Sequence, residues 1–125
     1  METTQGKAVN AYTALARMSQ KPMNSFAAFK LFKLKKTLAP IVEFQSEQEQ
    51  KLVEEIGATI TEFGAIVWDK KKEAQQRKEY ADRHKELEDM PCDVETKKIT
   101  MFMKEIPEIT IADMDALTEF IEWKE

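Results

Sequence analysis

The stretch Ser25-Phe-Ala-Ala-Phe-Lys-Leu-Phe-Lys-Leu-Lys-Lys-Thr-Leu38 has the composition of a helix, but its apolar residues do not share one face. At about 100° per residue, one stripe consists of small and aliphatic side chains, namely Ala27, Leu31, Leu34 and Leu38. Phe29 and Phe32 fall nearly opposite that stripe. Since a helix that is apolar on several sides must be covered on several sides, the stretch predicts a central helix or an oligomer interface.

Length and composition favour one domain over residues 1–125. Hydrophobic residues make up 42% of the chain, which is enough for a core, and the 3 Gly and 4 Pro leave little room for a loop-rich fold. Cys92 has no cysteine partner, which favours a reducing, cytoplasmic setting. Neither a signal peptide nor an apolar run of about 20 residues is visible, so we expect a protein without a membrane segment.

Charge is distributed unevenly around the net value of −4. Residues 1–40 carry 7 Lys/Arg against 1 Glu, a net charge of +6, whereas residues 87–125 carry 4 Lys against 11 acidic residues, a net charge of −7. The overall negative charge argues against nucleic acid and anionic membranes as partners. We favour pairing of the two poles within the fold, with head-to-tail self-association as the alternative.

Helical spacing predicts a first helix over residues 7–19, after a frayed segment 1–6. Asn24 or Ser25 can cap a second, long helix that runs to about residue 57. The apolar stripe continues past Pro40, so we favour a kinked helix over two separate ones. Gly57 is a suitable C-terminal cap.

Two glutamines, Gln45 and Gln48, make the middle of the long helix polar. They fit either the seam of a coiled coil or a solvent-exposed turn, and we favour the exposed turn.

Residues 59–68 are β-branched and aromatic and contain Gly64, which predicts a small β-hairpin. Asp69 can cap a charged helix over residues 70–89. The stripe of that helix is narrow and consists of Ala74 or Arg77, followed by Tyr80, His84 and Leu87.

Residues 94–103 alternate as a strand does. Thr110 then begins a capping box with Asp113, and a last amphipathic helix should bury Met114, Leu117, Phe120, Ile121 and Trp123. The expected fold class is therefore α+β and mostly helical: a long central helix, three shorter helices and a small β element.

Catalytic chemistry has little support in the residues. His84 is the only histidine and is expected to be a packed or surface residue. Cys92 lies beside Asp93, whose charge should raise the thiol pKa, so we expect an inert thiol. The chain contains no zinc, EF-hand, P-loop or dinucleotide-binding motif. We expect no enzyme, no metal and no cofactor.

The best candidate for a binding surface is the aromatic and basic part of the long helix. The expected protein interface comprises Phe26, Phe29, Phe32, Lys33 and Lys36. The alternative, contact with nucleic acid, would use Lys30, Lys33, Lys35 and Lys36. We favour burial in the core or self-association over contact with another protein, nucleic acid or a membrane. We expect a homo-oligomer, because the phenylalanine-bearing face needs more cover than this short chain provides.

The order of segments resembles a conserved-domain family of small bacteriophage and prophage proteins. The matching pieces are Glu54-Glu-Ile-Gly57, Gly64-Ala-Ile-Val67, Glu86-Leu87, the strand residues Val94 and Ile99, and Thr110-Ile-Ala-Asp-Met-Asp-Ala-Leu-Thr-Glu-Phe-Ile121. The resemblance covers residues 25–122, and Pro40 and the phenylalanine-rich start depart from it. It implies a phage origin and no particular activity.

These observations favour a non-enzymatic phage accessory protein that forms a homodimer or higher oligomer. It would act by stoichiometric protein binding in the host cytoplasm, for example by inhibiting a host or anti-phage defence complex. A minor head or tail component of the virion is one alternative. A nucleic-acid-binding regulator that uses residues 30–36 is another.

Overall fold

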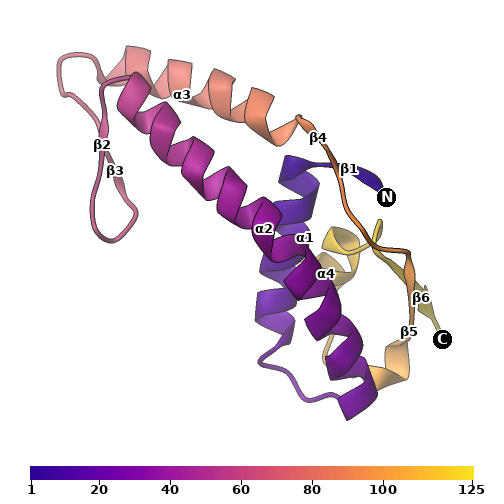
Figure 1. The fold of residues 1–125 in the computed structure, drawn as a ribbon. Helices are drawn as coiled ribbons and strands as arrows, with labels where there is room; N and C mark the ends of the chain where they lie inside the picture. Colours follow the sequence, from indigo (N-terminus) through magenta and orange to yellow (C-terminus); the bar gives the residue numbers. More distant parts are fainter.

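Helix α2, Ser25–Glu55, is the longest element and connects the two parts of the molecule (Figure 1). The computed structural model describes all residues from 1 to 125 and confirms the mostly helical α+β fold class. None of its helices has the length and apolar character needed to cross a membrane. The other elements are β1 Glu2–Thr4, α1 Gln5–Met18, β2 Thr59–Ile60, β3 Ile66–Val67, α3 Glu73–Glu88, β4 Pro91–Asp93, β5 Ile99–Phe102, the 3-10 helix η1 Met103–Glu105, α4 Ile111–Ala116 and β6 Ile121–Lys124.

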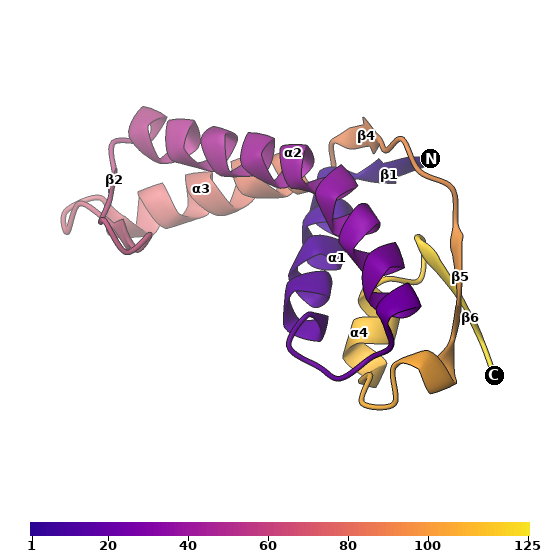
Figure 2. The same cartoon turned by 60° about the horizontal axis from the view of Figure 1, so that its bottom comes forward.

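The long helix passes through Pro40 without a break. Proline has no backbone N–H, so the carbonyl of Lys36 loses its helical donor and the helix can bend at this point. Figure 2 shows the axis of α2 changing direction between its two halves. The kinked helix that the apolar stripe predicted is therefore confirmed, and the bend directs its two halves onto different partners.

Both ends of α2 are capped by the residues that the sequence indicated. Asn24 is the N-cap, and its side-chain oxygen accepts a hydrogen bond of 2.8 Å from the backbone N–H of Ala27. Gly57 follows the last turn with a φ of +87°. The N–H of Ala58 donates to the Val53 carbonyl (3.0 Å) and that of Gly57 to the Glu54 carbonyl (3.1 Å), which is a Schellman motif.

Replacing Gly57 with alanine is expected to lower the free energy of unfolding by about 1 kcal/mol, because a side chain is strained at positive φ. A Cβ at this position would meet only the Gln76 amide nitrogen, at 3.4 Å, so backbone strain accounts for the loss. Gly57→Asn should cost less than Gly57→Ala, since asparagine tolerates this conformation better. Urea denaturation of the three proteins checks the order, and equal stability of all three would contradict it.

One part of the molecule, the body, consists of the N-terminal half of α2 and the elements that pack against one side of it. Figure 2 shows α1 and α4 beside this half, with β5 and β6 on the outside. Helix α1 contributes small side chains to this core, because Ala8, Ala11 and Ala14 are fully buried. The other buried residues of this core are Leu15, Met18, Ala27, Leu31, Leu34, Leu38, Val94, Met101, Ile106, Leu117, Phe120 and Ile121.

The C-terminal segment corrects one prediction. Thr110 does cap α4, accepting a hydrogen bond of 3.1 Å from the N–H of Asp113, but the helix ends at Ala116. The predicted continuation through Trp123 is wrong, because residues 121–124 form β6 and pair in parallel with β5, Ile99 opposite Ile121. Likewise, only residues 99–102 of the predicted strand 94–103 form β5, and Met103 lies in η1.

The other part, the arm, consists of the C-terminal half of α2, the β2–β3 hairpin and α3 (Figure 1). The hairpin predicted over residues 59–68 is confirmed, with β2 antiparallel to β3. The arm has its own small core of Leu52, Val53, Ile56 and Ala58, against which Ile66, Trp68 and Tyr80 pack. Since this core is much smaller than that of the body, we infer that the arm is the less stable part.

The start of α3 differs from the prediction. Helix α3 begins at Glu73, and Asp69 does not cap it; the Asp69 carboxylate instead accepts a hydrogen bond of 3.0 Å from the N–H of Lys71. Gln76, which the predicted stripe omitted, is buried, while Ala74 and Arg77 are exposed. The Gln76 side chain donates to the Ile56 carbonyl (3.0 Å) and accepts from the N–H of Asp69 (2.9 Å). These hydrogen bonds to the backbone of Ile56 and Asp69, which helical periodicity does not report, explain why Gln76 is buried.

Two further predictions are wrong. Residues 1–6 are not frayed, because β1 pairs with β4 and the N-terminal ammonium lies 3.1 Å from the Asp93 carboxylate. Gln45 is not in an exposed turn: its relative exposure is 4%, and Gln48 is half-buried. Gln45 continues the buried stripe of α2 at helical spacing, so its position on the helix outweighs its polarity.

Candidate functional site

The residues predicted as a protein interface lie together on the outer surface of α2. At about 100° per residue, Phe26, Phe29, Phe32, Lys33 and Lys36 fall within one third of the helix circumference, opposite the buried stripe. We call these five residues the aromatic–basic face. The relative exposures of the three phenylalanines are 81%, 60% and 59% in chain order. Intramolecular burial of this face, the first alternative that the sequence favoured, is therefore wrong, since the body already packs on the other side of α2.

The lysines around this face have no acidic partners. Lys33 Nζ lies 5.4 Å from the centre of the Phe29 ring, and Lys35 Nζ lies 5.5 Å from the centre of the Tyr12 ring. Lys30 Nζ donates to the Thr100 carbonyl at 3.3 Å. The ion pairs of the structure all involve other residues. The predicted pairing of the two charge poles thus leaves these lysines out, and the N-terminal half of α2 keeps an excess of positive charge.

Two hollows lie beside Phe32. The larger, between the end of α1 and the start of α2, has a volume of about 410 Å³ and is lined by Leu15, Ser19, Lys21, Pro22, Met23, Ala28, Leu31, Phe32 and Lys35. We call it the α1–α2 pocket. The second hollow has a volume of about 360 Å³ and is lined by Tyr12, Phe32, Lys35, Lys36 and Ala39. Phe32 and Lys35 line both hollows, so the two are neighbours. Together they give the surface next to the aromatic–basic face concave sites in which a ligand group can fit.

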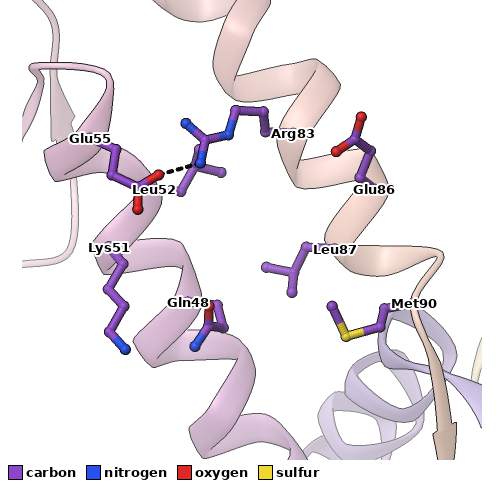
Figure 3. A pocket seen from close by; sticks show the side chains of 8 residues that line it. All are labelled: Gln48, Lys51, Leu52, Glu55, Arg83, Glu86, Leu87 and Met90. Carbon is purple, nitrogen blue, oxygen red and sulfur yellow. Dashed lines mark hydrogen bonds and ion pairs between the residues drawn. The ribbon is translucent and has the colours of Figure 1, made fainter.

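A third hollow lies in the arm, between α2 and α3 (Figure 3), and has a volume of about 200 Å³. Its apolar floor includes Leu52 and Leu87, whereas Arg83 and Glu55 form an ion pair across it. The remaining residues around it are Gln48, Lys51, Glu86 and Met90. Because Arg83 and Glu55 already neutralise each other inside the chain, this groove offers a ligand less than the lysine-bordered pocket does.

His84 links the two helices of the arm. Its Nε2 lies 2.7 Å from a carboxylate oxygen of Glu49 on α2, and its Nδ1 lies 2.7 Å from one of Glu88 on α3. The ring also stacks on Tyr80, with 5.2 Å between centres. Both ring nitrogens thus lie within contact distance of carboxylates. This contact joins helices and leaves no free nitrogen for a substrate.

Cys92 is half-buried in β4. Burial raises the pKa of its thiol above the ordinary value, and the charges of Asp93 and Glu119 raise it further. The predicted direction is confirmed, although burial contributes more than the neighbouring carboxylate on which the prediction depended. A thiol with a raised pKa is a weak nucleophile at neutral pH.

Asp113 forms a buried ionic cluster that sequence reasoning missed. Its relative exposure is 2%, and its carboxylate lies 2.8 Å from a guanidinium nitrogen of Arg17 and 3.4 Å from Lys21 Nζ. Burial acts to raise the pKa of Asp113, but hydrogen bonds from Arg17, Thr110 and Lys21 outweigh it and hold the pKa below its ordinary value. The cluster ties the end of α1 to α4. It also engages the head group of Lys21, which lines the α1–α2 pocket.

Comparisons of the chain with models of protein families, with curated proteins and with solved structures gave no match. The likeness to small phage proteins therefore remains an expectation from the order of segments.

Proposed function

We propose that this chain is a non-enzymatic binding protein that captures an acidic partner protein in fixed stoichiometry through the aromatic–basic face. The observation that carries the proposal is the exposure of Phe26, Phe29 and Phe32, at 81%, 60% and 59%, on one side of a single helix. Large exposed aromatic groups gathered in one place are typical of protein contact surfaces. The lysines beside them lack carboxylate partners and supply the charge complementarity.

A partner protein fits this face better than nucleic acid does. Nucleic-acid contacts derive most of their affinity from phosphates, so they need cations along an extended track. Here the lysines of and around the aromatic–basic face are confined to residues 30–36, in the N-terminal half of α2. Residues 41–68, which follow, carry 6 Glu against 1 Lys. That acidic segment would repel a continuing backbone. If the resemblance to phage proteins holds, the captured protein belongs to a host or defence complex, or to the virion.

The bend in α2 limits how a second copy can occupy the same face. Pro40 is exposed, and at about 100° per residue it lies on the same side of α2 as the aromatic–basic face. Figure 2 shows α1 and α3 on the inner side of the bend. The outer side is therefore convex, and two convex surfaces touch only near their crossing point. We accordingly place another protein before a second copy, and treat the predicted homodimer as an alternative that the experiment below distinguishes.

The test is capture with matched variants. Tagged wild-type protein, the double variant Phe29→Ala/Phe32→Ala and the control Phe63→Ala are each incubated with an extract of the cells in which the chain is naturally made. Phe63 has a relative exposure of 89% but lies in the hairpin of the arm. We expect wild type and Phe63→Ala to retain the same protein at a constant ratio, and the double variant to bind it at least about tenfold more weakly.

Other outcomes would replace the proposal. Equal capture by the double variant would contradict the assignment of the face. A wild-type dimer in light scattering that dissociates in the double variant would make a second copy the partner. Nucleic acid in the eluate, with binding that weakens steeply as salt rises, would move the function to a nucleic-acid regulator. Circular dichroism of all three proteins controls for unfolding.

A further inference from the structure

The α1–α2 pocket combines an apolar interior with a cationic edge. Leu15, Met23 and Leu31 provide apolar surface, and Phe32 stands at the border between the pocket and the aromatic–basic face. Its volume of about 410 Å³ lies within the range of sites that accept small ligands or whole side chains. An apolar hollow beside exposed aromatic groups is the arrangement in which one anchoring side chain contributes most of the affinity of an interface.

The two lysines at the pocket differ in what they can offer a ligand. Lys21 Nζ is already engaged by the Glu108 carbonyl, at 2.9 Å, and by Asp113. Lys35 has no carboxylate partner and lines both hollows, and Lys36, also unpaired, lines the second. A ligand that fills the pocket thus meets positive charge on the side of Lys35 and Lys36. The ligand that best complements the pocket therefore has a large apolar group with a carboxylate close to it.

We propose that the α1–α2 pocket is the anchor site for an acidic segment of the partner, which inserts one large apolar side chain and pairs neighbouring carboxylates with Lys35 and Lys36. This inference rests on the proposed function and adds the class of segment recognised. Leucine, phenylalanine and tryptophan have the size and apolarity that the pocket requires. Aspartate or glutamate next to them supplies the charge that the lysines lack inside the chain.

The probe is a displayed library of short random peptides, selected on the whole wild-type protein. We expect the enriched sequences to share one Leu, Phe or Trp flanked by Asp or Glu. Their affinities are then measured by fluorescence anisotropy against Ala28→Trp, which fills the pocket from an exposed position on its lining, and against Lys35→Glu. Each variant should weaken binding by about tenfold or more. Ala81→Trp, on the exposed surface of α3, is the matched control and should bind as wild type does.

Several results would overturn the inference. Enrichment of basic or uncharged peptides would contradict the acidic class, and equal binding to Ala28→Trp would show that the pocket is not the anchor. Peptides that lose binding in Phe29→Ala/Phe32→Ala but not in Ala28→Trp would leave the proposed function standing without this anchor. A library that yields nothing on wild type, although partner capture succeeds, would exclude a short segment as the recognised unit. Failure of both experiments would remove both proposals.

Discussion

Phe120→Ala is expected to lower the free energy of unfolding by about 3–5 kcal/mol. Phe120 has a relative exposure of 1% and belongs to the core of the body, together with Leu117 and Ile121. Truncation removes the transfer free energy of the ring and leaves a cavity, because the surrounding core relaxes only partially. Since small domains have a total stability of about 5–15 kcal/mol, this one change should remove a large share of it.

Equilibrium denaturation in urea measures the effect, and Phe63→Ala is the control. The Phe63 ring is almost fully exposed at the hairpin, so its removal should change the free energy of unfolding by less than about 0.5 kcal/mol. Near-equal stability of Phe120→Ala and wild type would contradict the placement of Phe120 in the core. Burial of Phe120 was also expected from the continuous C-terminal helix that the sequence pattern predicted.

That helix illustrates why part of the fold was not predictable. The spacing of Leu117, Phe120 and Ile121 fits a helix, and nothing local marks the end of α4 at Ala116. The decisive interaction is the parallel pairing of β6 with β5, which joins residues 22 positions apart, such as Ile99 and Ile121. By contrast, Asn24, Gly57 and Thr110 cap their helices through bonds to residues a few positions away, so sequence patterns located these ends well.

The candidate site likewise has some features that local helical spacing predicts and others that depend on contacts distant in the chain. Helical spacing alone placed Phe29 and Phe32 opposite the buried stripe, because angular position is a local property of α2. It could not show whether another element covers them. The α1–α2 pocket was not predicted, since it depends on how the loop after α1 leads into α2. The Asp113 cluster was missed for a similar reason: sequence reasoning treated Asp113 as part of a capping box, whereas Arg17, its main partner, is distant in the chain.

Asp113→Asn is expected to lower the free energy of unfolding at neutral pH by about 1.5–3 kcal/mol, the usual value of hydrogen bonds to a charged group. Asparagine keeps the size of the side chain but removes the negative charge that Arg17 and Lys21 share. Losing one partner of a fully buried ion pair costs about 3–5 kcal/mol. Arg17 is half exposed, however, and water can solvate it once the carboxylate is gone, so the lower range applies.

The same cluster should make the protein sensitive to acid. The pKa of Asp113 is lower in the folded state than its ordinary value of 3.8, so its contribution is complete above that value. It is lost as the pH falls from the ordinary value through the lowered folded value, because protonation then favours the unfolded chain. Glu119, whose pKa is lowered by hydrogen bonds from Thr3 and Lys7, adds to the same trend.

Urea denaturation across the acidic range separates the two carboxylates. The difference in free energy of unfolding between wild type and Asp113→Asn should be constant at neutral pH and shrink below the ordinary pKa of Asp113. Thr3→Val removes a hydrogen bond of 2.6 Å to Glu119 but leaves Asp113 intact. This variant should therefore still lose the free energy of unfolding that Asp113 contributes when the pH falls. A difference that stays constant into strong acid would show that the effect of Asp113→Asn does not come from the loss of the negative charge.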